Sequence, residues 1–456
     1  MHYHFSGIAG AGMNPLAQLM LAWGHTVQGS DRGFDQGRTP DVAQRLAAAG
    51  IVILPQDGTA VTPAVERFVY SAAVEADTPE MRAAKAGGIA CLARPGLLAE
   101  VINTAAPGIA ISGTSGKSTV TGMLAWILRQ TQTPATILGG AALAGEGVAG
   151  CFAVGPRGGI VAAEACESDG TLVGYRAGIG LIHNITRDHG ELAGLRAQFA
   201  TFAAQSKLLL VNAGCPEALA AAAAAASQGR VRSYGLGGAA DYPLEIISLG
   251  PSTSTAVLGL PQGDLTISLL HPGAHNLENA AAAAVIAIEL GLAPTAIAAA
   301  LATFPGVARR FEVVGITDTG IRVVDDYAHN ADKIRAAVQA AQAGADRVVA
   351  IFQPHGFGPA RFLRSELKVL LPTLLRPNDR WCYTNIFYAG GSVAQDIHSR
   401  DLAADLPAEL MAMHADDRQQ LLTWLCEQAG AGDTVLLMGA RDPDLPALAR
   451  AIHDVL

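Results

Sequence analysis

Short apolar runs alternate with helix-like segments along the first hundred residues of the chain. The runs HYHFSGI, HTVQGSD, IVILP and RFVYSAA read as strands, and apolar positions at helical spacing predict helices from about Asn14 to Trp23 and near Val42 to Ala48. Strands that alternate with helices are typical of a parallel sheet with crossover helices. We therefore expect a Rossmann-like first domain over residues 1–106, ending after the turn-prone stretch NTAAPG.

The same alternation continues in two further blocks. The strand-like runs GIVAAEA, LIHNIT and LLLVNA fall within residues 107–307, and RVVDDYAHN, RVVAIFQPH and TVLLMGA fall within residues 308–456. Between these blocks the chain passes through the Pro- and Gly-containing stretch TFPGVARRFE. The pattern predicts an α/β protein of three domains.

Composition narrows the class of protein. Half of the 456 residues are hydrophobic, 16% are charged and the formal net charge is −9, which favours a globular enzyme with small-molecule partners over a nucleic-acid-binding protein. The six cysteines form no CxxC pair, and the N-terminus lacks a signal-peptide pattern. The longest uncharged run, 290–308, is broken by Gly and Pro, so we expect a buried helix and a loop rather than a membrane span. These features predict a cytoplasmic protein without membrane insertion.

The segment AISGTSGKSTVTGMLAW reads as a strand, a glycine turn and a helix. It is a shortened form of the P-loop pattern, because Ile111 stands where the first glycine belongs. Backbone N–H groups at the start of the helix could face an anion, Lys117 could reach the β/γ-phosphates, and Ser118 or Thr119 could hold Mg²⁺. The predicted ATP-binding residues of this loop are Gly113, Thr114, Ser115, Gly116, Lys117, Ser118 and Thr119.

Acidic residues and a histidine follow two later strands. GIVAAEACESDG carries Glu164, Glu167 and Asp169, and LIHNITRDHGE carries Asp188 and His189. Ligands gather at the carboxyl ends of parallel strands, so an acid and a histidine there could complete a magnesium site. Glu167 and Asp169, taken alone, are interpreted as part of a turn or a helix cap.

The N-terminal loop Gly7-x-Ala9-Gly10-x-Gly12, followed by Asp31, is a weak dinucleotide fingerprint. Ala9 stands where the second glycine of that fingerprint belongs, which weakens an interpretation as an NAD site. An anion at a helix N-terminus fits the loop in either case.

Taken in order, the motifs resemble those of the Mur ligases over nearly the whole chain. They are GIAGAGM, GTSGKS, AEACESDG, NITRDH, GAHNLENA, ARRFE and DDYAHN. Three other segments, FVYSAAVEADTPEMRAAKAGGI, FQPHGFGPARF and YTNIFYAGG, are similar to the branch that joins L-alanine to UDP-N-acetylmuramate. The resemblance implies a Rossmann-like UDP-sugar domain, a central ATPase domain of the P-loop type with a mostly parallel sheet, and a C-terminal Rossmann-like domain for the amino substrate.

The activity implied is ATP-dependent amide formation during peptidoglycan precursor synthesis. A carboxylate is a poor acyl donor, so transfer of the γ-phosphoryl group would make an acyl phosphate that an amine attacks. By matched position, the resemblance implies catalytic roles for Lys117, His189, Arg310 and Asp326, and ATP contacts from Asn276, Asn279, Arg310 and Asp326. The implied magnesium ligands are Ser118, Glu164 and His189. The implied UDP-sugar residues are Gly7, Ala9, Gly10, Gly12, Met13, Ser30, Asp31 and Ser71. The candidates near the amino substrate are His329, His355, Arg361, Tyr388 and Ala389.

Four positions depart from the usual pattern of the alanine-adding branch. Ser115 stands for His, Cys166 for Asp, Arg187 for an acidic residue and Ala331 for Pro. These positions are close to the expected ATP and acceptor sites, so the alternatives are a recycling ligase that adds a tripeptide and a specialised ligase with another acceptor. An NAD-dependent oxidoreductase and a non-catalytic nucleotide-binding protein are the alternatives from other classes.

Overall fold

The computed structural model describes residues 1–71, 74–75, 77–146, 152–167, 170–186, 192–237, 239–388 and 393–456. The chain forms two compact units. The first unit contains Met1–Glu245, Val257–Ile267 and Glu278–Phe304, and the second contains Ile246–Ala256, Ser268–Leu277 and Pro305–Leu456.

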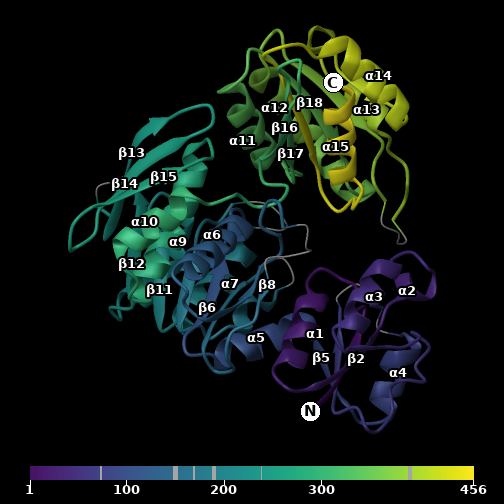
Figure 1. Ribbon diagram of the computed structural model, residues 1–456, viewed down its shortest axis with the longest axis vertical. Helices are drawn as coiled ribbons and strands as arrows, with labels where there is room; N and C mark the ends of the chain where they lie inside the picture. Colours follow the sequence, from purple (N-terminus) through teal and green to yellow (C-terminus); the bar gives the residue numbers. More distant parts are fainter. Residues whose placement is uncertain are drawn as a thin grey trace. The chain divides into compact units, whose positions relative to one another are not determined.

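A five-stranded parallel sheet in the order β3-β2-β1-β4-β5 forms the first part of the first unit (Figure 1). Its strands are β1 His2–Ser6, β2 Thr26–Ser30, β3 Val52–Ile53, β4 Arg67–Tyr70 and β5 Ala90–Ala93. Its helices are α1 Met13–Ala22, α2 Arg32–Asp35, α3 Pro40–Ala48, α4 Pro79–Ala86 and α5 Arg94–Thr104. The helices expected from the apolar spacing are therefore α1 and α3, with bounds that differ by one or two residues.

A ten-stranded sheet follows, in the order β15-β14-β13-β12-β11-β10-β6-β9-β7-β8. Its strands are β6 Gly108–Ser112, β7 Ala135–Leu138, β8 Phe152–Ala153, β9 Ile160–Glu164, β10 Ile179–Ile182, β11 Leu208–Asn212, β12 Val231–Leu236, β13 Tyr242–Leu249, β14 Ser254–Leu258 and β15 Leu265–Leu269. The helices are α6 Lys117–Gln130, α7 Leu192–Gln205, α8 Pro216–Ala226, α9 Ala274–Glu289 and α10 Pro294–Ala302, with a short 3₁₀ helix at Thr171–Gly174. From β7 to β12 through β9, β6, β10 and β11 the pairing is parallel, so the loops after these strands share one edge.

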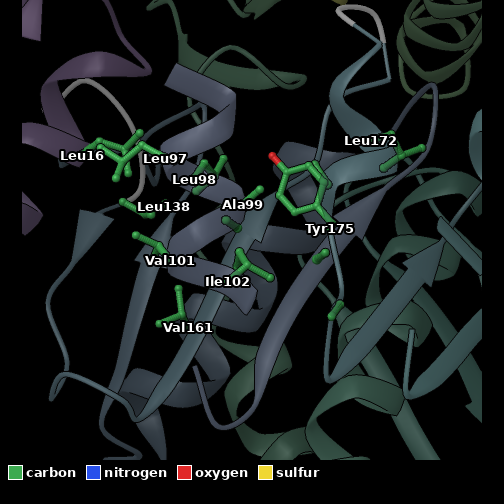
Figure 2. Close-up of a cluster of buried hydrophobic side chains, with 14 of the residues drawn as sticks. Leu16, Leu97, Leu98, Ala99, Val101, Ile102, Leu138, Val161, Leu172 and Tyr175 are labelled. Carbon is green, nitrogen blue, oxygen red and sulfur yellow. The ribbon is translucent and has the colours of Figure 1, made fainter. Parts of the chain in front are cut away.

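Helix α5 packs against both sheets of the first unit. Leu97, Leu98, Val101 and Ile102 belong to one buried cluster that also contains residues of α1 and of β9, such as Leu16 and Val161 (Figure 2). A helix that is apolar on more than one side is buried on more than one side. For that reason the two sheets share a continuous core in this unit.

The second unit is built on a six-stranded sheet in the order β16-β17-β21-β18-β19-β20, in which β16 is antiparallel and the other strands are parallel. Its strands are β16 Glu312–Ile316, β17 Arg322–Asp326, β18 Val348–Gln353, β19 Arg380–Thr384, β20 Met413–Ala415 and β21 Thr434–Gly439. Its helices are α11 Ala331–Gln342, α12 Phe357–Leu374, α13 Ser399–Ala404, α14 Arg418–Gln428 and α15 Leu445–Val455, with a 3₁₀ turn at Ala408–Leu410. Helices α11, α12 and α13 cover one face of the sheet, and α14 and α15 cover the other (Figure 1).

The uncharged run 290–308 contains α10, whose Ile297, Ala300 and Leu301 are buried, followed by a loop, as expected from its sequence. In the part of the chain that the structure describes, no helix is both long and apolar enough to cross a membrane. The α/β class and the mostly parallel sheets expected from the sequence are confirmed.

Candidate functional site

The glycine turn after β6 leads directly into the N-terminus of α6. Strand β6 is fully buried, and α6 begins at Lys117 with Gly116 as its N-cap. Gly113 and Gly116 have φ values of 142° and 86°, which favour glycine at both positions. A side chain at Gly116 would also lie 2.5 Å from Oδ1 of Asn279. The predicted loop therefore has the backbone of an anion cradle at a helix N-terminus.

The Lys117 side chain is paired with an acidic residue beside the loop. Its Nζ donates to Oε2 of Glu167 at 2.9 Å and to the carbonyl oxygen of Gly113. Burial alone lowers the pKa of Lys117, but Glu167, Cys166 and Glu164 together outweigh burial and raise that pKa above its ordinary value. The ammonium group is therefore charged at neutral pH.

Glu167 accepts the N–H of Gly170 at its backbone carbonyl at 3.2 Å, as expected of a turn residue, but its side chain has a further role. Its side chain is 3% exposed and forms the ion pair with Lys117, three residues after the end of β9 at Glu164. Strand β9 is the parallel neighbour of β6, with Glu164 opposite Ile111. The position of Glu167 just after β9, the strand that neighbours the phosphate loop, was the sequence signal that could have indicated this contact. Asp169 and Asp188 lie outside the described residues.

Ser118 and Glu164 lie together beside Lys117. The Ser118 hydroxyl donates to Oε2 of Glu164 at 3.1 Å, and Oε1 of Glu164 accepts the backbone N–H of Gly140 at 2.5 Å. A hydroxyl oxygen and a carboxylate oxygen suit Mg²⁺, which completes its shell with water and phosphate oxygens. The third expected ligand, His189, lies outside the described residues, and the described residues contain no cluster of three His, Cys, Asp or Glu side chains for a metal.

The two asparagines of HNLEN lie on α9. Asn276 donates from Nδ2 to the carbonyl oxygen of Pro272 at 2.7 Å. A side chain that caps a helix N-terminus accepts a backbone N–H instead, so this bond is not an N-cap. Asn279 is 4% exposed, and its Oδ1 has no hydrogen-bond partner among the described residues. A buried amide oxygen without a donor costs about 1–3 kcal/mol, so a ligand that supplies an N–H would be favoured there.

The loop after β1 is held by residues at the end of β2. The N–H groups of Gly7 and Ile8 donate to the carbonyl oxygen of Ser30 at 2.9 and 3.0 Å, and Oδ2 of Asp31 accepts the N–H of Ala9 at 3.0 Å. The other Asp31 oxygen accepts the N–H of Gly33 at 2.8 Å. The carboxylate therefore shapes the loop through both of its oxygens.

The other residues predicted to bind the sugar nucleotide lie at the same edge. Ser71 follows β4, and its Cβ is 3.2 Å from where a Cβ would lie on Gly7. Gly10 accepts the N–H of Met13 at 2.9 Å, but the Met13 side chain is 1% exposed and belongs to the core. Gly12 is the N-cap of α1.

Two residues near this loop escaped the sequence analysis. Arg94 brings its guanidinium against Gly12, where a Cβ would lie 3.0 Å from Cδ and 3.3 Å from Nη1 of the arginine. Glu80 is fully buried, and its carboxylate accepts hydrogen bonds from side chains on β1 and β2. Glu80 lies within the segment FVYSAAVEADTPEMRAAKAGGI, but nothing in that segment indicates burial of its carboxylate, and Arg94 lies outside the quoted motifs.

In the second unit, Arg310 and Asp326 lie at the carboxyl end of β17. Asp326 accepts the N–H groups of Phe311 and Ala328 at 2.6 and 2.7 Å, and the Arg310 guanidinium lies 4.5 Å from the centre of the Tyr327 ring. Burial raises the pKa of Asp326 above its ordinary value, although Arg310 acts in the opposite direction.

Two of the candidates for the amino substrate, His329 and His355, are in ring contact, with centroids 5.2 Å apart. Nδ1 of His329 donates to the carbonyl oxygen of Tyr327 at 2.8 Å, which leaves Nε2 as the lone-pair nitrogen of the neutral ring.

The other three candidates do not share this contact. Tyr388 packs edge-on against Phe357, and Arg361 forms an ion pair with Asp396 on the surface of α12. Ala389 lies outside the described residues.

Comparison with known proteins identifies the family. The Mur ligase family catalytic domain matches residues 2–105, the Mur ligase middle domain matches 111–287, and the Mur ligase glutamate ligase domain matches 309–441. A relative from Stenotrophomonas maltophilia (strain K279a), named UDP-N-acetylmuramate–L-alanine ligase, is 34% identical over 96% of this chain and 92% of its own. The chain belongs to the Mur ligase family.

Other relatives of this Mur ligase have similar names. One from Arthrobacter sp. (strain FB24), also named UDP-N-acetylmuramate–L-alanine ligase, is 37% identical over 78% of this chain and 76% of its own. The solved UDP-N-acetylmuramate–alanine ligase of Thermotoga maritima has a TM-score of 0.77 at 24% identity, covering 100% of this chain and 98% of its own. A murein peptide ligase of Psychrobacter arcticus 273-4 has a TM-score of 0.67 at 22% identity with the same coverage. The resemblance inferred from the motifs is confirmed, and the two solved structures show that this Mur ligase has the fold of the family.

Proposed function

We propose that this Mur ligase joins L-alanine to the carboxylate of UDP-N-acetylmuramate at the expense of ATP, in peptidoglycan precursor synthesis. The observation that carries the proposal is the 34% identity over 96% of the chain to an enzyme of that name, combined with the phosphate loop built around Lys117. ATP and sugar nucleotides are cytoplasmic compounds, so we propose a cytoplasmic location. The proposed domains are 1–106 for the UDP-sugar, 107–307 for ATP and 308–456 for the amino substrate, and the three family matches support these limits.

The proposed reaction has two chemical steps. A carboxylate oxygen of the sugar attacks the γ-phosphorus of ATP, ADP leaves, and the product is an acyl phosphate. The amine then attacks the acyl carbon, loses a proton, and the tetrahedral intermediate collapses to an amide and inorganic phosphate. Orientation of the reactants and neutralisation of charge supply most of the rate in such a transfer.

Lys117 is proposed to bind the β/γ-phosphates. The positive charge that now faces Glu167 at 2.9 Å would turn to the phosphate oxygens. Ser118, Glu164 and His189 would hold a magnesium ion, and such an ion, when bound, neutralises charge on the phosphates. The oxygen donors present at Ser118 and Glu164 fit this role.

The remaining predicted residues are proposed in the roles that the motifs imply. Asn276 and Asn279 would contact the adenine, and the unpartnered Oδ1 of Asn279 fits an adenine amino donor. Arg310 and Asp326 would contact ATP and take part in catalysis. The loop Gly7–Met13, with Ser30, Asp31 and Ser71, would bind the UDP-sugar. His329, His355, Arg361, Tyr388 and Ala389 would surround the amine.

The test is release of phosphate from ATP in the presence of UDP-N-acetylmuramate and one amine at a time. The amines are L-alanine, glycine, L-serine and the tripeptide of the recycling reaction. We expect the highest kcat/KM with L-alanine. Turnover with the tripeptide alone would assign the recycling reaction instead, and the absence of turnover with every pair would overturn the ligase proposal.

Lys117→Ala tests the role of the phosphate loop in the same assay. We expect turnover to fall by at least about a hundredfold, because one charge that stabilises the transferred phosphoryl group is lost. The matched control is Lys207→Ala, which removes an exposed lysine of the same unit and should keep wild-type turnover. Circular dichroism checks folding, because Lys117→Ala leaves Glu167 buried without its cation. Equal activity of the folded Lys117→Ala and control proteins would contradict the assignment.

A further inference from the structure

The four residues after β10, His183–Thr186, run beside the phosphate loop. Strand β10 is the parallel neighbour of β6, and their register pairs Ile182 with Ser112. The backbone pairing continues past the strands, because the N–H of His183 donates to Ser112 at 3.0 Å and the N–H of Thr114 donates to Asn184 at 3.0 Å. The phosphate loop is therefore hydrogen-bonded along its first residues to the segment His183–Thr186.

Within this segment, the Asn184 side chain forms hydrogen bonds with both the N–H and the carbonyl group of Ser115. Oδ1 of Asn184 accepts the N–H of Ser115 at 2.8 Å, and Nδ2 donates to the carbonyl oxygen of Ser115 at 3.1 Å. The backbone carbonyl of Asn184 accepts the N–H of the preceding residue, Thr114. Three hydrogen bonds from one asparagine thus define where the middle of the loop lies.

A second pair of hydrogen bonds, between Thr114 and Thr186, links the loop to the same segment. The Thr114 hydroxyl donates to the carbonyl oxygen of Thr186 at 3.2 Å and accepts the N–H of Thr186 at 3.0 Å. Thr114 is 5% exposed, so this pair of hydrogen bonds is shielded from water. The loop is consequently held along its length rather than at one point.

We propose that Asn184 is a positioning residue that preorganises the phosphate loop for the triphosphate of a nucleotide. The loop contains two glycines with positive φ, and glycine has a larger set of accessible backbone conformations than other residues. A cradle of N–H groups binds an anion most tightly when its geometry exists before the ligand arrives, because ordering then costs nothing at the moment of binding. Asn184 supplies that order through Ser115 and does not itself need to touch the phosphates.

The inference rests on the proposed function only in taking ATP as the ligand of the loop, so its test measures nucleotide binding without sugar or amine. Titration calorimetry with a non-hydrolysable ATP analogue and Mg²⁺ gives the dissociation constant. We expect Asn184→Ala to weaken nucleotide binding about tenfold, the effect of losing a pair of partly coupled hydrogen bonds. A parallel titration with UDP-N-acetylmuramate should give the wild-type constant.

Asn184→Asp is a nearly isosteric variant that protects the test against misfolding. One carboxylate oxygen can still accept the N–H of Ser115, but the other faces the carbonyl oxygen of Ser115 and adds a negative charge near the triphosphate. We expect weaker nucleotide binding than in Asn184→Ala. A folded Asn184→Asp protein that binds the nucleotide like the wild type would contradict the positioning role.

The chain offers a matched control in Asn103. Its side chain makes the same pair of bonds to backbone groups, accepting the N–H of Arg176 at 2.7 Å and donating to the carbonyl oxygen of Gly174 at 3.0 Å. Asn103→Ala should lower the melting temperature but leave nucleotide affinity unchanged.

Three outcomes would overturn the inference. The first is an Asn184→Ala protein that is folded and binds the nucleotide as tightly as the wild type. The second is an equal loss of affinity in Asn103→Ala, which would indicate a general effect of instability. The third is a wild type that binds no ATP analogue, which would overturn the proposed function as well. A ligase that binds the analogue normally but turns over none of the amines would contradict the proposed function alone.

Discussion

Glu80→Ala should destabilise the first unit more than any loss of a surface charge. Glu80 is fully buried near the start of α4, and its carboxylate accepts three hydrogen bonds. They come from Nε2 of His4 at 2.8 Å, the hydroxyl of Ser30 at 2.6 Å and the hydroxyl of Ser6 at 2.5 Å. Removing the carboxylate leaves three buried donors without this acceptor.

The size of the effect follows from those three donors. A buried donor left unpaired costs about 1–3 kcal/mol, and a hydrogen bond to a charged acceptor such as the Glu80 carboxylate contributes about 1.5–3 kcal/mol. The two serine hydroxyls can rotate toward other acceptors, so the three costs do not simply add. We expect Glu80→Ala to lower the free energy of unfolding by about 3–5 kcal/mol.

A pH dependence should accompany this loss. Burial alone raises the pKa of Glu80, but the hydrogen bonds from His4, Ser30 and Ser6 outweigh burial and hold the pKa below its ordinary value of 4.5. The unfolded state then binds more protons than the folded state just below that value. The stabilisation by Glu80 is therefore complete above pH 4.5 and is lost as the pH falls through the folded pKa.

The assay is urea unfolding, monitored by circular dichroism. It compares the wild type, Glu80→Ala and a control variant, Glu100→Ala. Glu100 pairs with Arg67 at 3.2 Å, but its side chain is 48% exposed, so its loss should cost less than about 1 kcal/mol. Glu80→Gln should fall between the two variants and lose the acid dependence. Equal unfolding free energies for Glu80→Ala and Glu100→Ala would refute the reasoning.

Two further predictions concern the phosphate loop and the second unit. Gly116→Ala should weaken ATP binding by at least about tenfold, because its φ is 86° and the new Cβ would lie 2.5 Å from Oδ1 of Asn279. Gly145→Ala, with φ 81° and open space around its Cβ, should keep wild-type affinity, and equal affinities in calorimetry would contradict the steric argument. Burial raises the pKa of Asp325 from 3.8 to about 6 despite the nearby Arg309, so the folded state binds more protons than the unfolded state between these values. The wild type should therefore lose stability as the pH rises through that range, Asp325→Asn should remove this dependence, and parallel stability curves in urea unfolding would argue against it.

Much of the secondary structure was predictable because its causes are local. Helix α1 was expected from about Asn14 to Trp23 and spans Met13–Ala22. It was predictable because its apolar side chains recur at the 3.6-residue period of a helix, which can be seen within the segment itself. The phosphate loop was predictable for the same reason. Two glycines and a helix N-terminus define an anion cradle within a few consecutive residues.

The side chains that hold the site depended on the tertiary structure. Ser115 meets Asn184 across 69 residues, Lys117 meets Glu167 across 50, and His4 meets Glu80 across 76. The first two contacts exist because parallel strands bring their carboxyl ends to one edge in a particular register, and the third exists because α4 packs against the first sheet. That register results from packing of the whole sheet and is absent from the local pattern.

Helix α5 shows the same division. The run RPGLLAEVINT forms α5, and the spacing of its apolar residues, which is a property of the segment alone, places them on more than one side of that helix. Which surfaces cover those sides is a property of the folded unit, where Leu97 and Val101 join a core built from both sheets (Figure 2). The sequence determined the elements and the chemistry of the loop, and the packed structure decided which distant side chains hold them in place.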